Sequence, residues 1–145
     1  MFTKLSKQIE KFRSLSENEL MKYLSENQGL KEEIIYLNTY GQLYEGIDSK
    51  GGSLGTYTPY TISIKERKGQ PTDHVTLKDT GEFYSSFNVS LTSDYDLHIT
   101  AQPIKDDTDL TEKYGDAIIG LSEESISRIR SMVKFIALNF IRQNT

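Results

Sequence analysis

The sequence predicts an α+β fold, in which a small antiparallel β-sheet is packed by a long C-terminal helix and a preceding helix. Three observations support this fold class. Apolar residues recur at steps of three and four near both ends of the chain, which is the period of an amphipathic helix. In the central part they alternate with polar residues, which is the period of a strand with one solvated face. Clusters of Gly, Asp and Ser separate these segments and predict loops.

The N-terminal part is expected to be helical. A first amphipathic helix is predicted from a stripe of four apolar residues, Phe2, Leu5, Ile9 and Phe12. A second helix is predicted from about residue 17 to residue 26, because Ser16 and Glu19 have the spacing of a capping box. We expect residues 1–28 to form an N-terminal helical extension and residues 29–145 to form the α+β domain.

A third helix is predicted after Asn27 and Gly29, which provide a stop for the second one. Its apolar stripe is Leu30, Ile34, Leu37 and Tyr44, with Gly41 on the same face. A glycine-rich loop is then expected over residues 48–55.

The central part is expected to form strands. Tyr60, Ile62 and Ile64 alternate with polar residues and predict a strand, which Pro59 would begin. An exposed loop is expected over residues 66–74. Two alternating runs then predict a β-hairpin with one wet face. The first run is Phe87, Val89 and Leu91, and the second is Tyr95, Leu97, Ile99 and Ala101.

The C-terminal helix has the clearest pattern in the chain. Ser122 is a suitable N-cap, and Glu123 and Glu124 complement the helix dipole. Its apolar seam, which is expected to face the sheet, is Ile126, Ile129, Val133, Ile136 and Phe140. A charged loop over residues 103–109 precedes it.

Composition excludes several classes of protein. The chain has no cysteine, which rules out a disulfide framework and a thiolate metal site. A net charge of -4 argues against a general nucleic-acid binder, because such proteins need a basic surface to neutralise phosphates. The longest apolar runs are far too short to span a membrane. Nine tyrosines on a polar chain suit a protein that contacts other proteins.

The triplet Asp79, Thr80, Gly81 raises the sharpest enzymatic hypothesis, a homodimeric aspartic protease. In that chemistry two carboxylates share one proton in a shielded, apolar cradle. Here Lys78 and Glu82 flank the triplet and would place charges where shielding is needed. The structural alternative, which we favour, is a turn in which Asp79 caps a helical turn and Gly81 adopts positive φ or permits close packing.

The other candidate sites are weaker. Asp94, Asp96 and His98 would project from one face of a strand and could bind a divalent metal, but alternation alone accounts for a solvated face there. His74 lies in a polar loop without a nearby nucleophile. The glycines of residues 48–55 lack the Lys-Ser/Thr ending of a phosphate loop. We therefore expect no catalytic residue, metal or cofactor.

Residues 79–87, with the sequence DTGEFYSSF, resemble the D-T-G-x-hydrophobic-x-x-Ser-hydrophobic signature of phage tail-completion and head-to-tail joining proteins. The motif residues are Asp79, Thr80, Gly81, Phe83, Ser86 and Phe87. Residues 43–80, which include LYEGID, LGTY and KGQPTDHVTLKDT, are similar to small virion proteins of crAss-like and related Bacteroidetes phages. The similarity covers about residues 30–145, so the first two helices lie outside it.

The resemblance implies a structural protein of the virion neck. Such proteins have a small sheet packed by a long helix and form rings, typically dodecameric, between portal and tail. It also implies partners among the portal and adjacent neck or tail proteins, no membrane, DNA only passing through the channel, and synthesis in the bacterial cytoplasm. Apolar and long-loop residues are the expected assembly contacts: Phe2, Leu5, Ile9, Phe12, Leu54, Tyr57, Lys68 and Pro71. The alternatives are the aspartic protease and a small adaptor that binds one cellular protein through its tyrosines.

Overall fold

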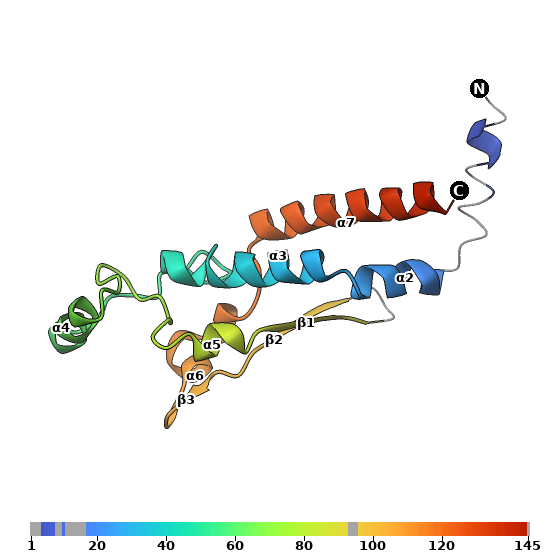
Figure 1. Ribbon diagram of the computed structural model, residues 1–145. Helices are drawn as coiled ribbons and strands as arrows, with labels where there is room; N and C mark the ends of the chain where they lie inside the picture. The colour runs from blue at the N-terminus through green and yellow to red at the C-terminus, as the bar shows by residue number, and fades with distance from the viewer. Residues whose placement is uncertain (1–3, 8–9, 11–16, 93–95, 145) are drawn as a thin grey trace.

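The computed structural model describes residues 4–7, 10, 17–92 and 96–144, and it has the predicted α+β fold (Figure 1). Residues 4–7 and 10 are helical. The longer helices are α2 (Glu17–Ser25), α3 (Gln28–Thr39), α4 (Pro59–Arg67) and α7 (Glu123–Gln143). The shorter ones are η1 (Leu43–Glu45), α5 (Glu82–Ser85), α6 (Leu110–Tyr114) and η2 (Asp116–Ile118). The strands are β1 (Asn88–Leu91), β2 (Leu97–Thr100), β3 (Ile104–Lys105) and β4 (Thr108–Asp109).

The boundary between α2 and α3 lies at Asn27, as predicted. The Asn27 Oδ1 accepts a hydrogen bond from the Leu30 amide at 2.9 Å, so this residue caps α3. Gly29 lies inside the first turn of α3 and does not end a helix. The predicted third helix also ends earlier than expected, because α3 stops at Thr39 and Gly41 lies in the turn that follows. A Cβ at Gly41 would lie 2.7 Å from the Leu37 carbonyl oxygen, so this turn needs glycine.

The strand expected over residues 60–64 is wrong, because this segment forms the helix α4. The Thr58 Oγ1 accepts a hydrogen bond from the Thr61 amide at 3.3 Å, and Pro59 occupies the first turn. A hydroxyl N-cap followed by proline is a helix start, since proline lacks the N–H that a first turn leaves unpaired. Figure 1 places α4 at the end of the molecule opposite α2.

The β1–β2 hairpin is confirmed. The strands pair antiparallel, with Val89 opposite Ile99 and Leu91 opposite Leu97, so the apolar side chains share one face. The polar residues Thr92, Ser93 and Asp94 predict the turn between them, and of these Ser93 and Asp94 lie outside the described part of the chain, as does Tyr95 of the second run. The loop expected over residues 103–109 contains a second short hairpin, β3–β4, which turns at Asp106 with a φ of 53°.

Two apolar clusters form the core. One joins the residues around the D-T-G turn, namely Leu43, Leu54, Val75, Phe83, Tyr84, Phe87, Leu110 and Ile118. The other joins α3, the β1–β2 hairpin and α7 through Leu30, Ile34, Val89 and Ile129. The predicted cap of α7 is confirmed, since the Ser122 Oγ accepts a hydrogen bond from the Ser125 amide at 3.2 Å.

The seam of α7 was expected to face the sheet. In the structure α7 packs mainly against α2 and α3 instead, and it shares the second apolar cluster with Val89 of the hairpin through Ile129. Phe140 at the end of the seam stacks on Tyr23 of α2, with ring centroids 4.5 Å apart. Met21 and Leu24 of α2 are buried. The division of the chain at residue 28 stays a prediction.

Two buried amides hold the start of α7 against the end of α3. The Asn38 side chain donates to the Ile118 carbonyl at 2.9 Å and accepts from the Gly120 amide at 2.7 Å. The Gln42 side chain donates to the Gly120 carbonyl at 2.8 Å and accepts from the Ser122 amide at 2.8 Å. Both residues are almost fully buried, so these four bonds satisfy groups that water does not reach. These bonds position the first residues of α7 relative to the end of α3.

Candidate functional site

The D-T-G turn is held by hydrogen bonds around a glycine in the left-handed conformation. Gly81 has a φ of 88°, which confirms the predicted positive φ, and it precedes the short helix α5. The Thr80 Oγ1 accepts a hydrogen bond from the Glu82 amide at 3.3 Å. The Ser86 Oγ donates to the Phe83 carbonyl at 2.6 Å and accepts from the Gln102 amide at 2.9 Å, which ties the motif to the chain that follows β2.

The aromatic residues of the motif fill the first core cluster. Phe83 and Phe87 are buried, and their rings meet edge to face at 5.1 Å. Tyr84 is also buried, and its hydroxyl donates to the Thr76 carbonyl. Burial raises the pKa of the Tyr84 hydroxyl far above its ordinary range. The hydrophobic positions of the signature therefore stabilise the turn from within.

Asp79 does not cap α5, so that prediction is wrong. N-capping would place its oxygens on the first amides of the helix, but they bind two lysines instead. The Lys68 Nζ lies 2.8 Å from Oδ1, and the Lys105 Nζ lies 3.1 Å from Oδ2. The hydrogen bond from Lys68 and, to a smaller extent, the one from Lys105 hold the pKa of the Asp79 carboxyl well below its ordinary value. Asp79 thus joins the end of α4 to strand β3 across the D-T-G turn.

A small cavity of about 290 Å³ lies beside this carboxylate. Lys65 of α4 is buried in its wall, where it donates to the Gln70 Oε1 at 3.2 Å and to the Lys78 carbonyl at 3.5 Å. Its Nζ also lies 4.7 Å from the centre of the Tyr57 ring. This cluster was not predicted, because residues 60–64 were interpreted as a strand. A helical interpretation places Lys65 and Lys68 on one face.

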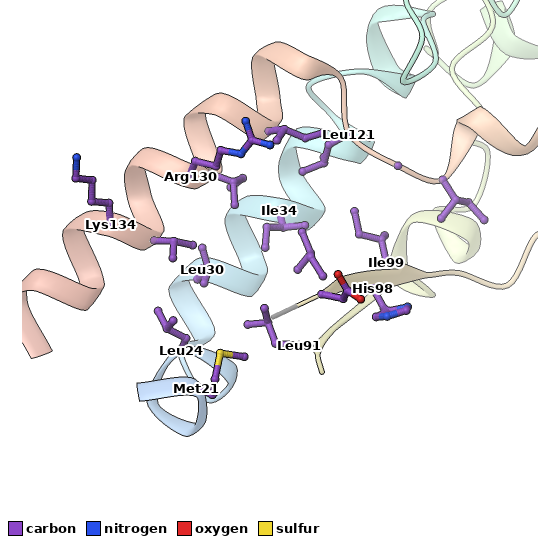
Figure 2. A pocket seen from close by; sticks show the side chains of 17 residues that line it. Met21, Leu24, Leu30, Ile34, Leu91, His98, Ile99, Leu121, Arg130 and Lys134 are labelled. Atoms are coloured by element: carbon purple, nitrogen blue, oxygen red, sulfur yellow. The ribbon is translucent and has the colours of Figure 1, made fainter. Parts of the chain in front are cut away.

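A larger apolar groove of about 890 Å³ lies between α7 and the β1–β2 hairpin, with α3 as its floor (Figure 2). Its walls are almost entirely aliphatic: Met21, Leu24, Leu30, Ile34, Leu91, Leu97, Ile99, Ile119, Leu121, Ile126, Ile129 and Val133. Charged residues occur at the two rims. Arg130 and Lys134 lie on the α7 side, while Asp96 and His98 lie on the hairpin side. This volume is near the upper end of the range for ligand pockets, and the lining is that of a hydrophobic recognition groove.

Six of the eight expected assembly contacts are exposed, half-buried or outside the described residues. Leu5 and Lys68 are exposed at the surface, and Lys68 is ion-paired with Asp79. Pro71 is half-buried. Phe2, Ile9 and Phe12 lie outside the described residues.

Leu54 and Tyr57 are not free to be buried by a neighbour, and the expectation that they need one is corrected. Leu54 is 7% exposed and lies in the first core cluster. Tyr57 is half-buried, and its hydroxyl accepts a hydrogen bond from the Thr76 amide at 2.9 Å. The loop after Gly46 folds back because the Leu54 amide donates to the Gly46 carbonyl at 2.8 Å. Leu77 has a φ of 55° and packs against the same cluster.

The face of the hairpin that carries Asp96 and His98 is solvated, as expected from the alternation. Asp96 and His98 are exposed, and Asp94 lies outside the described residues. Among residues 4–7, 10, 17–92 and 96–144, no group of three or more His, Asp or Glu side chains is arranged to hold a metal ion. His74 binds the Tyr44 carbonyl through Nε2 at 2.7 Å, and this bond raises the pKa of its ring. It therefore supports the loop around Gly46.

Large apolar side chains that belong to no core cluster are exposed on the helices. Tyr60 of α4 is 76% exposed, and Phe135 of α7 is 65% exposed. Leu138, also on α7, is exposed as well. No helix in the described part of the chain is long and apolar enough to cross a membrane. A scan against protein-family models, a search of curated proteins and a search of solved structures each found no match.

Proposed function

We propose that this chain is a structural subunit of the neck of a tailed bacteriophage, where many copies form a ring between portal and tail. Under this proposal the protein carries out no catalysis and needs no cofactor. By its resemblance to head-to-tail joining proteins the ring is dodecameric, with a channel through which DNA passes. Its other partners are the portal and the adjacent neck or tail proteins.

The observation that carries the proposal is an open apolar groove together with exposed aromatic side chains on the helices. The open groove has aliphatic walls, and the exposed faces of α4 and α7 carry Tyr60 and Phe135. Apolar grooves of this kind bind amphipathic segments of other chains, so the groove is a candidate contact site. Aromatic residues in particular are enriched where proteins meet.

The D-T-G motif supports the same function by a different route. Its glycine, serine and aromatic residues build a turn on the first core cluster, and its aspartate connects the end of α4 with β3. A ring subunit needs such a rigid junction, because small changes of angle between its contact surfaces would prevent ring closure. A structural role therefore accounts for the motif without any catalysis.

The geometry of Asp79 argues against the aspartic protease. A protease dyad needs a carboxylate that shares a proton with its partner from the second subunit. Here both oxygens of Asp79 are bound by lysines, which keep the carboxylate charged. A second carboxylate at this position would have to displace both lysines.

Labelling of virions tests the proposal. An antibody against the chain, applied to purified particles of the phage that encodes it, should mark the head–tail junction in electron micrographs. Particles made without the protein should accumulate as filled or empty heads that lack tails. Normal infectious particles that contain none of the chain would refute the neck assignment.

Two further results would favour the alternatives. Cleavage of a peptide library at acidic pH, abolished by Asp79→Asn while the fold is retained, would favour the protease. A stoichiometric complex with one host protein, and no incorporation into particles, would favour the adaptor.

A further inference from the structure

We infer that the groove between α7 and the β1–β2 hairpin binds the N-terminal amphipathic segment, residues 2–12, of a second copy of this chain. The inference rests on the proposed function, since it names the contact that joins one subunit to the next. The acceptor is the groove described above, and the donor is the stripe of Phe2, Leu5, Ile9 and Phe12.

Of the donor stripe, the structure describes Leu5, and this side chain is not buried in its own chain. Residues 4–7 and 10 are helical and exposed, and Leu5 keeps 53% of its surface accessible. An amphipathic helix gains little stability alone and needs an apolar surface to cover its stripe. Amphipathic helices commonly bind by laying residues at such spacings into a hydrophobic groove.

The acceptor groove is large enough and has the right chemistry. Its lining is aliphatic from α2 to α7, and its volume of about 890 Å³ can take several large side chains. The groove also begins at α2, through Met21 and Leu24, where the preceding chain of 16 residues joins the body. The donor of one copy therefore leaves from the edge of that copy's own groove.

The charges on the two flanks of the donor match the two rims of the groove. Successive residues of a helix are rotated by about 100°, which places Glu10 on one side of the apolar stripe and Lys4 on the other. The α7 rim of the groove is basic, with Arg130 and Lys134, and the hairpin rim carries Asp96. Only one of the two directions along the groove pairs Glu10 with the basic rim and Lys4 with Asp96. Charge thus selects a single direction of binding.

Self-association tests the apolar part of this contact. Sedimentation of the full-length protein should show assembly that rises with concentration. Leu5→Asp should weaken this assembly by about tenfold or more, because it places a charge in an apolar groove. Ser6→Asp adds the same charge at the next residue, away from the centre of the stripe, and should have little effect. Equal assembly of the two variants, or a wild-type chain that stays monomeric at its highest soluble concentration, would overturn the inference.

A charge swap tests the direction. Glu10→Arg and Arg130→Glu should each weaken assembly, and the double variant should recover most of the loss. Both side chains are exposed, so neither change threatens the fold of the single copy. Losses that simply add in the double variant would contradict the pairing.

Cross-linking tests whether the donor comes from a second copy. Because the chain has no cysteine, each introduced thiol is unique. Oxidation of a mixture of Lys4→Cys and Asp96→Cys chains should give a covalent dimer that contains one of each. Lys4→Cys mixed with Leu138→Cys, on the outer face of α7, should not. A disulfide that forms only within a Lys4→Cys/Asp96→Cys double variant would show binding within one chain and overturn the inference.

The inference and the proposed function can fail separately. If the cross-link forms but virions lack the protein, the contact between copies is supported and the neck assignment is refuted. The protein could instead be found at the head–tail junction while no cross-link forms and Leu5→Asp assembles like the wild type. In that case the neck assignment is supported and the contact between copies is refuted.

Discussion

Replacement of Asp79 by asparagine should lower the stability of the protein by about 1 kcal/mol at neutral pH and low salt. The carboxylate makes ion pairs of 2.8 and 3.1 Å with Lys68 and Lys105. The side chains of these two lysines are 48% and 37% exposed, so water screens both pairs. Exposed pairs of this kind contribute about 0.2–1 kcal/mol each, and two of them give the figure above. For a chain of 145 residues, this corresponds to a melting temperature lower by about 3–4 °C.

The assay is thermal and urea unfolding of the wild type and the variant side by side. Asp107→Asn is the matched control, because it removes the same charge from an exposed position in the β3–β4 turn. It should leave stability nearly unchanged. The effect of Asp79→Asn should shrink in about 1 M salt, where exposed ion pairs are screened. Equal melting temperatures for Asp79→Asn and wild type at low salt would refute the argument.

The same ion pairs predict how the effect depends on pH. The pKa of Asp79 is lower in the folded protein than in the unfolded chain, where it lies near its ordinary value of about 3.9. Its stabilising contribution is therefore fully present above about pH 5, and it is lost as pH falls through the folded pKa. The difference between wild type and Asp79→Asn should stay constant from pH 7 to about pH 5 and diminish below about pH 4. A difference that grows in acid would contradict this assignment.

Three further predictions concern the residues that hold the fold. Gly81→Val should lower the free energy of unfolding by about 2 kcal/mol or more in urea unfolding, because a β-branched residue is strained at a φ of 88°. Asn38→Ala should cost about 2–4 kcal/mol by the same assay, since it leaves the Ile118 carbonyl and the Gly120 amide buried without partners. The pKa of His74 is raised in the folded protein, so its contribution is present below about pH 6.5 and is lost as pH rises through the folded value. NMR titration should therefore give a His74 pKa above that of the unfolded chain. The wild type should lose free energy of unfolding between pH 5.5 and pH 8, and His74→Gln should make this loss smaller.

The sequence predicted the elements whose local signals agree with one another. In α7 the hydroxyl cap of Ser122, the acidic first turn and the apolar seam all indicate one helix, and the structure has it at Glu123–Gln143. The β1–β2 hairpin follows in the same way from alternation on both strands. Positive φ at Gly81 was predicted because the motif required a turn.

The failures have specific causes. Alternation of Tyr60, Ile62 and Ile64 favoured a strand, but three residues are too few to outweigh the helix start at Thr58 and Pro59. The cap assigned to Asp79 failed because Lys68 and Lys105 lie 11 and 26 residues away in sequence, and local spacing gives no information on such pairs. The groove could not be predicted either. It lies where α3 separates α7 from the hairpin, and distant bonds from Asn38 and Gln42 hold the chain that leads into α7.

The burial of Leu54 changes which surfaces can join subunits. If the loop over residues 48–55 had carried the contact, a single flexible arm would have reached its neighbour. With Leu54 in the core, the available apolar surfaces are on helices and in the groove. Under the inferred contact, the donor stripe and the acceptor groove are two different patches, so the contact would be heterologous and would repeat from copy to copy until a ring closes. A contact of one patch with itself would stop at a dimer. Under the proposed function, Tyr60 and Phe135 then remain outside the ring contact, which leaves α4 and the outer face of α7 for the proteins above and below.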